Sequence, residues 1–284
     1  MKIIRSLDGI GYDQIFDSFK EAFADYEMQL TKDQLIGMLV RRGFIEKLSF
    51  GCFVDDRLIA FTLNGIGNFN GIVTAYDTGT GTIKDYRGKG IATDIFNYSI
   101  PFLKDSGVKQ YLLEVLQHNT KAVSVYSKLG FEVIREFNYF GQSTELLNDK
   151  SNKVKSDIKY NKSNLDEVSK CTDFWDFHPS WQNDFNAISR SIATFDFLGA
   201  YFENNIIGYC ILESATGDIS QIAVSKQYRN KGIGTTLVSK ILKLNNYHSV
   251  KAINTDVDCE SMTSFFKKLN FEHQGKQFEM IKPF

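Results

Sequence analysis

The stretch Tyr86-Arg87-Gly88-Lys89-Gly90-Ile91-Ala92 lies between an extended run and a run of apolar residues at helical spacing. It returns as Tyr228-Arg229-Asn230-Lys231-Gly232-Ile233-Gly234, and both copies follow the pattern Arg-x-x-Gly-x-(Gly/Ala). The first N–H groups of a helix attract phosphate, and a glycine removes the side chain where a phosphate would touch the backbone. We therefore predict a phosphate-binding turn in each copy.

The sequence around the two copies is duplicated as well. Residues 53–61 match residues 201–209 as hairpins, and residues 125–131 match residues 265–271. The repeat is too long for a solenoid. Two copies of one α+β domain are the simplest explanation, at residues 1–141 and 157–284. Residues 142–156 are polar and are expected to form a linker.

Local patterns predict most of the elements in the first copy. We expect a strand over 1–6, a helix carrying Ile15 and Phe19, and a helix that begins at a capping box on Thr31. The short polar turn at 55–57 predicts a hairpin. Pro101 is expected to end or kink the helix after the first loop, and residues 131–140 are expected to form a final strand pair.

Composition excludes several classes of protein. A chain with 43% hydrophobic and 24% charged residues is typical of globular proteins, and a net charge of −1 disfavours nucleic acid as the main partner. No apolar run is long enough to cross a membrane, and no Cys or His spacing indicates a metal site. The cysteines, which are expected to be buried and reduced, and the lack of a signal peptide favour the cytoplasm. These cysteines are Cys52, Cys171, Cys210 and Cys259.

Neither loop has the Gly-x-x-x-x-Gly-Lys-(Ser/Thr) pattern of nucleotide triphosphatases or the Gly-x-Gly-x-x-Gly pattern of dinucleotide folds. Residues 82–92 and 222–234 instead resemble the acyl-CoA motif of the GNAT N-acetyltransferase superfamily. The resemblance implies a mixed, mainly antiparallel sheet flanked by helices in each domain, with acetyl-CoA as co-substrate held through its pyrophosphate by the loop amides. It implies the following cofactor-binding residues: Thr82, Ile83, Lys84, Arg87, Gly88, Lys89, Gly90, Ile91, Ala92, Asn119, Val224, Arg229, Asn230, Lys231, Gly232, Ile233 and Gly234.

A second resemblance concerns catalysis in the first copy. The stretch from Glu114 through Asn119 and Tyr126 to Phe131 is similar to that of ribosomal-protein N-terminal alanine acetyltransferases. This similarity implies that Glu114 is the base, directly or through a water, that Tyr126 is the general acid and that Asn119 contacts the CoA arm. Asp77 is the reserve candidate for the base. The alternatives are structural: a lone polar position on a buried strand for Glu114, a core side chain for Tyr126, and an N-cap for Asn119.

The second copy lacks these groups. Asn254 aligns with Glu114, Cys259 with Asn119, and Phe266, which has no proton to donate, with Tyr126. The second copy is therefore non-catalytic or uses other groups, for which Glu203, Glu213 and Asp218 are available.

In the fold that the resemblance implies, the region before the second helix of each copy lines the acceptor groove. Asp25 and Glu27 in the first copy could attract a cationic amine, or could belong to a solvated face. The second copy has an aromatic cluster in this region, which could form a substrate wall or simply pack. This cluster consists of Trp175, His178, Pro179 and Trp181.

Together the resemblances imply acetyl transfer from acetyl-CoA to a primary amine by direct transfer in a ternary complex, in the first domain. The alternatives are an acyl-CoA-binding sensor or interaction module without turnover, and an enzyme whose second domain is catalytic. The sequence leaves open whether the amine belongs to a small molecule or a peptide N-terminus, and which oligomer forms.

Overall fold

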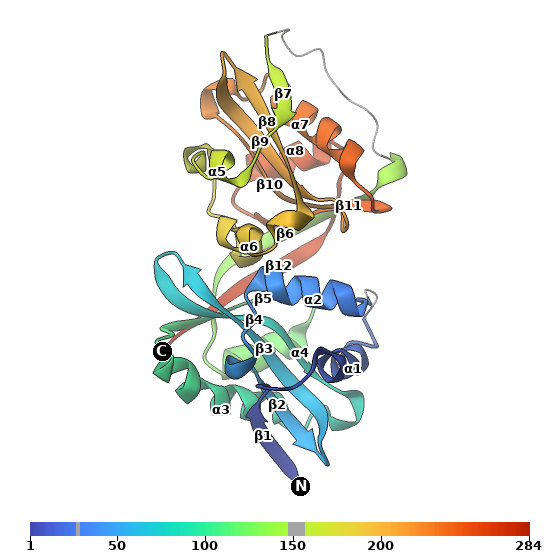
Figure 1. Ribbon diagram of the computed structural model, residues 1–284, viewed down its shortest axis with the longest axis vertical. Helices are drawn as coiled ribbons and strands as arrows, with labels where there is room; N and C mark the ends of the chain where they lie inside the picture. The colour runs from blue at the N-terminus through green and yellow to red at the C-terminus, as the bar shows by residue number, and fades with distance from the viewer. Residues whose placement is uncertain (27–28, 147–156) are drawn as a thin grey trace. The chain divides into compact units, whose positions relative to one another are not determined.

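The computed structural model describes residues 1–26, 29–146 and 157–284, which form two compact units (Figure 1). Unit 1 contains Met1–Ile134 and Phe278–Phe284, and unit 2 contains Arg135–Gln277. Two long strands, β6 (Glu132–Ser143) and β12 (Glu272–Pro283), have residues in both units. Glu27 and residues 147–156, the main part of the expected linker, lie outside the described residues.

Unit 1 contains a sheet in the order β1-β2-β3-β4-β5, continued by the end of β12. Its helices and remaining strands are β1 (Lys2–Ser6), α1 (Tyr12–Ala22), α2 (Lys32–Arg42), β2 (Phe50–Val54), β3 (Arg57–Phe69), β4 (Ile72–Thr82), α3 (Ile91–Asp105), β5 (Gln110–Leu116) and α4 (Thr120–Lys128). Within β1 to β5 of unit 1, neighbouring strands are antiparallel except for β4 and β5, which are parallel.

Unit 2 repeats this order with a sheet β7-β8-β9-β10-β11, continued by β6 and the beginning of β12. Its elements are β7 (Lys159–Lys162), α5 (Leu165–Val168), α6 (Phe185–Arg190), β8 (Phe195–Phe202), β9 (Asn205–Glu213), β10 (Asp218–Val224), α7 (Ile233–Ile241), β11 (Ser249–Asp256) and α8 (Glu260–Lys268). Here β10 and β11 are the parallel pair. The expected α+β fold with a mixed, mainly antiparallel sheet is confirmed in both units.

Local sequence explains several element boundaries in unit 1. The Thr31 side chain accepts a hydrogen bond from the N–H of Gln34, which returns one to the Thr31 N–H, so the predicted capping box is confirmed. Gly43 ends α2 in the left-handed conformation. Of the two outcomes expected at Pro101, an end of α3 is wrong, because the helix continues to Asp105, and a kink stays a prediction. Proline removes one helical hydrogen bond, and the buried Phe96 and Leu103 on either side hold the helix against the core.

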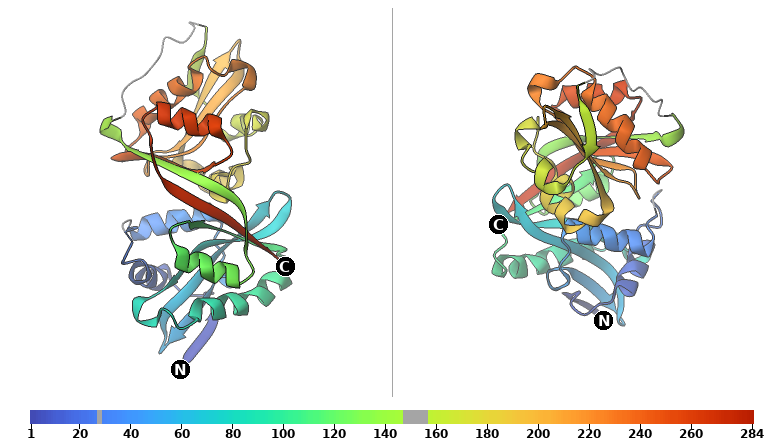
Figure 2. Two further views of the ribbon diagram at one scale, coloured as in Figure 1. Left: turned by 180° about the vertical axis from the view of Figure 1, so that it is seen from behind. Right: turned by 45° about the horizontal axis from the view of Figure 1, so that its top comes forward.

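Residues 131–140 do not form the expected strand pair but belong to one strand, β6. The unit boundaries also differ from the predicted ones, because β6 leaves unit 1 and pairs with β11 in unit 2. Conversely, β12 leaves unit 2, and its residues from Phe278 onward, with the last residue Phe284, belong to unit 1. The two strands lie side by side, as Figure 2 shows. Each unit is therefore completed by a strand that follows the other unit in sequence.

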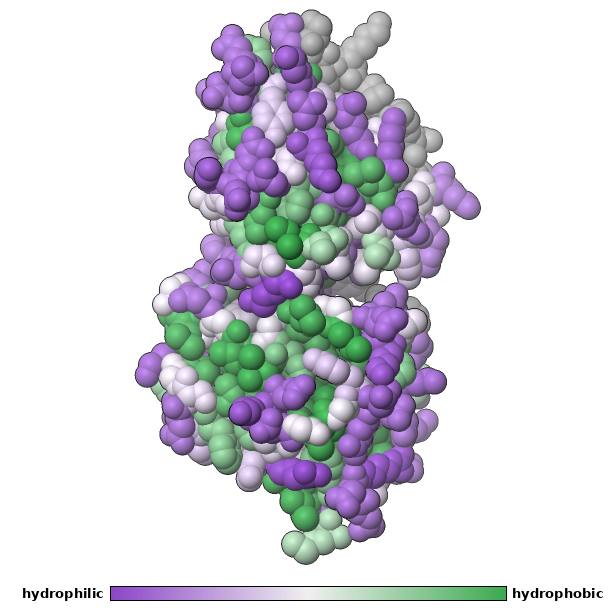
Figure 3. Space-filling model, in the orientation of Figure 1, coloured by the Kyte–Doolittle hydropathy of each residue, from purple (hydrophilic) through white to green (hydrophobic). Residues whose placement is uncertain are grey.

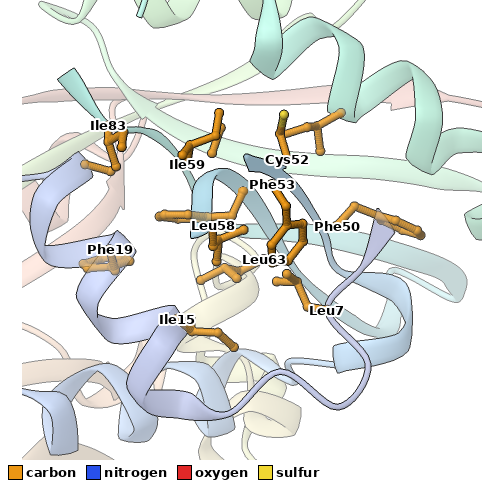
Figure 4. Packing of buried hydrophobic residues seen from close by; sticks show 14 of the residues in the cluster. Leu7, Ile15, Phe19, Phe50, Cys52, Phe53, Leu58, Ile59, Leu63 and Ile83 are labelled. Atoms are coloured by element: carbon orange, nitrogen blue, oxygen red, sulfur yellow. The ribbon is translucent and has the colours of Figure 1, made fainter. Parts of the chain in front are cut away.

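Each unit has its own hydrophobic core. In unit 1 the side chains of α1, β2 and β3 interdigitate around Leu58, Leu63 and Phe53 (Figure 4). A second cluster of unit 1 joins Phe96, Tyr111 and Tyr126 to Met280 from β12. Hydrophobic side chains also reach the surface, mixed with polar ones, on the face drawn in Figure 3. No helix within the described ranges has the length and hydrophobicity to span a membrane.

Candidate active site

The two glycine loops have the same backbone path. Each begins with a 3₁₀ turn, Lys84–Tyr86 or Lys226–Tyr228, and ends at a glycine that precedes α3 or α7. Gly90 and Gly232 are both left-handed, with φ of 74° and 80°, and neither has a side chain that could cap the helix. A Cβ added at Gly90 would meet nothing within 4 Å, so the approach to these helix N–H groups is open. This geometry suits a pyrophosphate.

Arg87 holds the first loop against α1 and β4. Its guanidinium donates to the carbonyls of Thr82 at 3.1 Å and Ala22 at 2.9 Å, and to the Asp25 carboxylate at 2.7 Å. Lys84 lies 3.7 Å from Asp25, and Lys89 donates to the Asp85 carbonyl. The hydrogen bond from Arg87 lowers the pKa of Asp25. The Asp25 carboxylate therefore neutralises positive charge of Lys84 and Arg87 at the beginning of the loop.

Arg229 makes the same three contacts in the second loop. It donates to the carbonyls of Val224 at 2.9 Å and Phe174 at 2.7 Å, and to Asp176 at 2.8 Å. Lys231 donates to the Gln227 carbonyl, as Lys89 does to that of Asp85. The arginine of the motif thus shapes both loops. The sequence indicated a positive charge at this position, but it did not show which groups the arginine side chain would contact.

The parallel strands of unit 1 separate next to the first loop. The pairing of β4 with β5 ends at Tyr76 and Leu112, and β4 has an irregularity at Thr78, which is skipped in the pairing with β3. Asp77 and Glu114 follow immediately, so both carboxyl groups lie where the gap opens. Successive residues on a strand point to opposite faces of the sheet. Tyr76 and Asp77 accordingly contact different helices.

Asp77 contacts Tyr126 of α4. The Tyr126 hydroxyl donates to Asp77 Oδ2 at 3.2 Å, Thr80 Oγ1 donates to the same oxygen at 2.9 Å, and the Gly79 N–H donates to Oδ1 at 2.9 Å. Burial raises the pKa of Asp77 from 3.8 to about 6 although these hydrogen bonds oppose the shift. Burial, followed by the charge of Asp77, raises the pKa of Tyr126 well above its usual value of 10.

Glu114 lies beside Tyr76. A hydrogen bond joins the two side chains, and burial together with the Glu114 charge raises the pKa of Tyr76. Arg42, near the end of α2, places its guanidinium 6.0 Å from the centre of the Tyr76 ring and donates to the Thr78 carbonyl at 2.9 Å. Sequence reasoning missed Arg42, because its distance in sequence from the gap gave no signal.

Asn119 caps α4, because its Oδ1 accepts from the N–H of Ala122 at 3.3 Å. Its amide also donates to the hydroxyl of Tyr26 at 3.0 Å. The N-cap role that we left open is therefore present. A contact between Asn119 and the CoA arm stays a prediction.

Unit 2 has apolar residues at the positions of the Tyr126 hydroxyl and the Asp77 carboxyl group of unit 1. The irregularity of β10 falls at Ser220, four residues before Val224, as that of β4 falls four residues before Thr82. Ile219 therefore corresponds to Asp77. Ile219 and Phe266 lie in one buried cluster. The sequence showed the loss at Phe266, and the register adds the matching loss at Ile219.

The gap between β10 and β11 is bridged by the residues of a short 3₁₀ segment, Trp181–Asn183, and its N-cap Ser180. Asn183 accepts from Gln221 on β10 at 2.6 Å and donates to the Ile253 carbonyl on β11 at 3.0 Å. Asn254, the counterpart of Glu114, donates to Ser180 Oγ at 2.9 Å. These contacts fill the gap between β10 and β11 at the level of Asn254, the position that Glu114 has in unit 1.

The aromatic cluster before this segment is largely packed. Trp181 is 3% exposed, and the Trp175 indole donates to the Tyr209 hydroxyl at 2.7 Å. His178 lies 3.9 Å from Asp184, and its Nδ1 lies 2.8 Å from the carbonyl of Pro179. Packing thus accounts for Trp175 and Trp181, which we had considered as a substrate wall.

Between residues 176–177 and the beginning of α8, unit 2 has a cavity of about 350 Å³ with acidic walls. Its carboxylates include Asp256, Asp258 and Glu260, where the first copy has Leu116, His118 and Thr120. The lining residues are Asp176, Phe177, Asp256, Asp258, Cys259, Glu260 and Ser261. Such walls repel an anionic ligand more than those of unit 1 would.

The other candidates for unit 2 are engaged elsewhere. Glu203 lies in the turn of the β8–β9 hairpin, and Glu213 accepts from Thr216 at 2.7 Å. Asp218 is 1% exposed and accepts from Ser220 at 3.2 Å. Within the described ranges, no three His, Cys, Asp or Glu side chains gather as a metal ion would require.

A strand gap that ends beside an uncapped helix N-terminus is present in both units, and it is the arrangement that the resemblance to acyltransferases implies. Comparison with known families agrees. The description "Acetyltransferase (GNAT) family" matches residues 12–131, and "Acetyltransferase (GNAT) domain" matches residues 193–273. The chain belongs to this family of acyltransferases and carries two of its domains in tandem.

Curated relatives match part of the chain. An "Uncharacterized N-acetyltransferase YobR" of Bacillus subtilis is 32% identical over 27% of this chain and 28% of its own length. "N-alpha-acetyltransferase 30" of Schizosaccharomyces pombe is 36% identical over 22% of this chain and 43% of its own. "N-alpha-acetyltransferase MAK3" of Arabidopsis thaliana is 28% identical over 30% and 45%. The chain therefore spans less than half the length of each of these relatives.

Solved structures match the whole fold. A tandem GNAT protein from the clavulanic acid biosynthesis pathway has a TM-score of 0.76 at 12% identity, covering 100% of this chain and 98% of its own. A GCN5-related N-acetyltransferase from Sphaerobacter thermophilus has a TM-score of 0.75 at 13% identity, covering 99% and 95%. At these identities the likeness shows the tandem fold alone.

Proposed function

We propose that this protein is an acetyl-CoA-dependent N-acetyltransferase that transfers acetyl to a primary amine, and that unit 1 is the catalytic unit. The observation that carries the proposal is the hydrogen bond between Tyr126 and Asp77, at the point where β4 and β5 separate beside the glycine loop. Unit 2 has Phe266 and Ile219 at these positions, although its loop has the same form.

We expect the first glycine loop, before α3, to bind acetyl-CoA. The N–H groups at the start of α3 would hold the pyrophosphate of acetyl-CoA, and Gly88 and Gly90 leave room for it. Arg87 supports this binding by fixing the loop to α1. The gap between β4 and β5 would receive the pantetheine arm, which brings the thioester to the level of Asp77 and Glu114.

Transfer requires a base for the amine and an acid for the leaving thiolate. Glu114 would take the proton of the amine, directly or through a water, while its hydrogen bond with Tyr76 holds it in place. The amine then attacks the thioester carbon within the ternary complex. Tyr126 would donate its proton to the CoA sulfur as the tetrahedral intermediate collapses.

The acceptor is an amine of a small molecule or a peptide N-terminus. Two of the relatives are N-alpha-acetyltransferases by name, which favours the peptide N-terminus. The free cysteines, three of them buried, suit a reducing compartment such as the cytoplasm.

The test is acceptor-dependent thiol release from acetyl-CoA, measured across a panel of amines and peptides. We expect Tyr126→Phe to lower kcat by about 10- to 1000-fold while the Kd of acetyl-CoA, measured by calorimetry, stays the same. The variant keeps the ring, which packs 5.9 Å from Phe96, and removes only the hydroxyl. Tight acetyl-CoA binding without thiol release for any acceptor would instead indicate a sensor.

A further inference from the structure

Asp77 is a buried carboxyl group with an unusual set of partners. Its two oxygens accept three hydrogen bonds, from the Gly79 N–H, the Thr80 hydroxyl and the Tyr126 hydroxyl. The side chain is held between β4 and α4 with only 9% of the residue exposed. Neither the loop nor the fold requires an acid here, because unit 2 builds the same irregular strand with Ile219.

The position of Asp77 creates a difficulty for an acid at Tyr126. When Tyr126 gives its proton away, its oxygen becomes negative 3.2 Å from a carboxylate in a buried site. Two like charges at this distance in a medium of low dielectric are strongly disfavoured. Burial and Asp77 together raise the pKa of Tyr126 well above 10, in agreement with this. An ionised Asp77 would therefore oppose the step proposed for Tyr126.

A protonated Asp77 removes the difficulty. Burial raises the pKa of Asp77 to about 6, so this carboxyl group can hold a proton near neutral pH. Its Oδ2 lies at hydrogen-bond distance from the Tyr126 oxygen, so no movement of the backbone is needed for a proton to pass.

Resting on the function proposed above, we propose that Asp77 is a proton store that reprotonates Tyr126 while Tyr126 protonates the departing CoA sulfur. The Tyr126 O–H bond breaks and an S–H bond forms. At the same time the Asp77 O–H bond breaks and a new O–H bond forms on Tyr126. Tyr126 remains neutral, the thiolate becomes a thiol and Asp77 becomes a carboxylate, which takes its next proton from water.

Other titratable and charged groups surround this pair. The charge of Arg42 of α2 lowers the pKa of Asp77, and the charge of Asp77 contributes to raising the pKa of Tyr111 of β5. Tyr76 is the neighbour of Asp77 in β4 and contacts Glu114, and Tyr26 acts on Tyr126. The pH dependence of kcat in the wild type therefore reflects the titration of several groups at once. Variants that change only the Asp77–Tyr126 pair are therefore needed.

The first experiment is a double-mutant cycle on kcat with Asp77→Asn and Tyr126→Phe. Asparagine has the shape of aspartate and cannot store the proton. We expect Asp77→Asn to lower kcat by about 10- to 1000-fold without changing the Kd of acetyl-CoA. The kcat of the double variant should be no lower than that of the more impaired single variant, because both residues act on one step. Asp105→Asn, the same change at an exposed position ending α3, is the control.

The second experiment is the pH dependence of kcat. Because the protonated form of Asp77 is needed, kcat of the wild type should fall as pH rises through the pKa of Asp77 in the complex. Asp77→Asn should lack this decline. Thr80→Val removes a hydrogen bond that lowers the pKa of Asp77, so it should move the decline to higher pH.

Three results would overturn the proton store and leave the proposed function standing: kcat of Asp77→Asn within about twofold of the wild type, single effects that multiply, or a decline that Thr80→Val does not move. Unchanged turnover in Tyr126→Phe is a different result, since it removes the acid and the store with it.

Discussion

At the scale of single residues, Asp77 shows a conflict between stability and function. A buried carboxylate is disfavoured unless its hydrogen bonds replace the water that it loses. Three donors reach Asp77, yet burial still raises its pKa from 3.8 to about 6. The folded protein therefore binds a proton at Asp77 more tightly than the unfolded chain does. An acid retained at a destabilising position is characteristic of a functional site.

This conflict predicts that Asp77→Asn stabilises unit 1 above pH 6. Between pH 3.8 and about 6 the folded state holds a proton that the unfolded state has lost. Wild-type stability therefore rises as pH falls through this window, and the cost of the ionised side chain is fully present above it. A shift from 3.8 to about 6 corresponds to about 3 kcal/mol at most.

Urea unfolding at several pH values measures this difference. We expect the free energy of unfolding of Asp77→Asn to exceed that of the wild type at pH 8, and the gap to shrink as pH falls to 4. Asparagine keeps the hydrogen bonds, because the hydroxyls of Thr80 and Tyr126 can turn to accept from its amide. A variant less stable than the wild type at pH 8 would show that Asp77 stabilises the fold.

At the scale of elements, the two long strands decide how the halves are built. β12 supplies Met280, which is 1% exposed and packs with Tyr111 and Tyr126 in unit 1. β6 supplies Phe140, which is fully buried and packs 5.6 Å from Phe266 in unit 2. Each strand thus completes the core of the unit opposite to the one suggested by its place in the duplicated sequence.

The exchange makes a prediction that neither half alone would suggest. Met280→Ala should destabilise unit 1 by about 2–5 kcal/mol, and Phe140→Ala should destabilise unit 2 by about 3–5 kcal/mol. Hydrogen exchange read peptide by peptide distinguishes the units. Faster exchange in β4 and β5 is expected for the first variant, and in β10 and β11 for the second. The reverse pattern would refute the exchange of strands.

β6 and β12 also show which features of the fold the sequence could not predict. Turns, caps and apolar spacing are local, so the hairpin at 55–57, the capping box at Thr31 and both loops were predictable. The partner of a strand is not local, because alternation indicates a buried face and not a neighbour. For the same reason the sequence did not predict the Asp77–Tyr126 hydrogen bond. Both residues were site candidates, but only the packing of α4 against β4 brings them together.

At the scale of the whole molecule, two similar loops accompany one complete set of reactive groups. Arg87 and Arg229 fix their loops by equivalent contacts, so both loops have the form that we propose to hold a pyrophosphate. In unit 2, Asn183 bridges the gap between the strands and the neighbouring cavity is acidic. We therefore expect unit 2 to bind acetyl-CoA weakly and without transfer, whereas unit 1 has both the loop and the proposed acid and base.

A glutamate placed in each loop separates these roles. Gly90 and Gly232 are left-handed, so a side chain strains the turn, and a carboxylate repels phosphate. We expect Gly90→Glu to abolish both thiol release and the tighter acetyl-CoA site in calorimetry. Gly232→Glu should remove only the weaker site and leave kcat within about twofold of the wild type. Each variant is the control for the other, because the substitution and the backbone conformation are the same. If Gly232→Glu abolished turnover while Gly90→Glu retained it, catalysis would belong to unit 2, and its general acid would have to lie at a position other than Phe266.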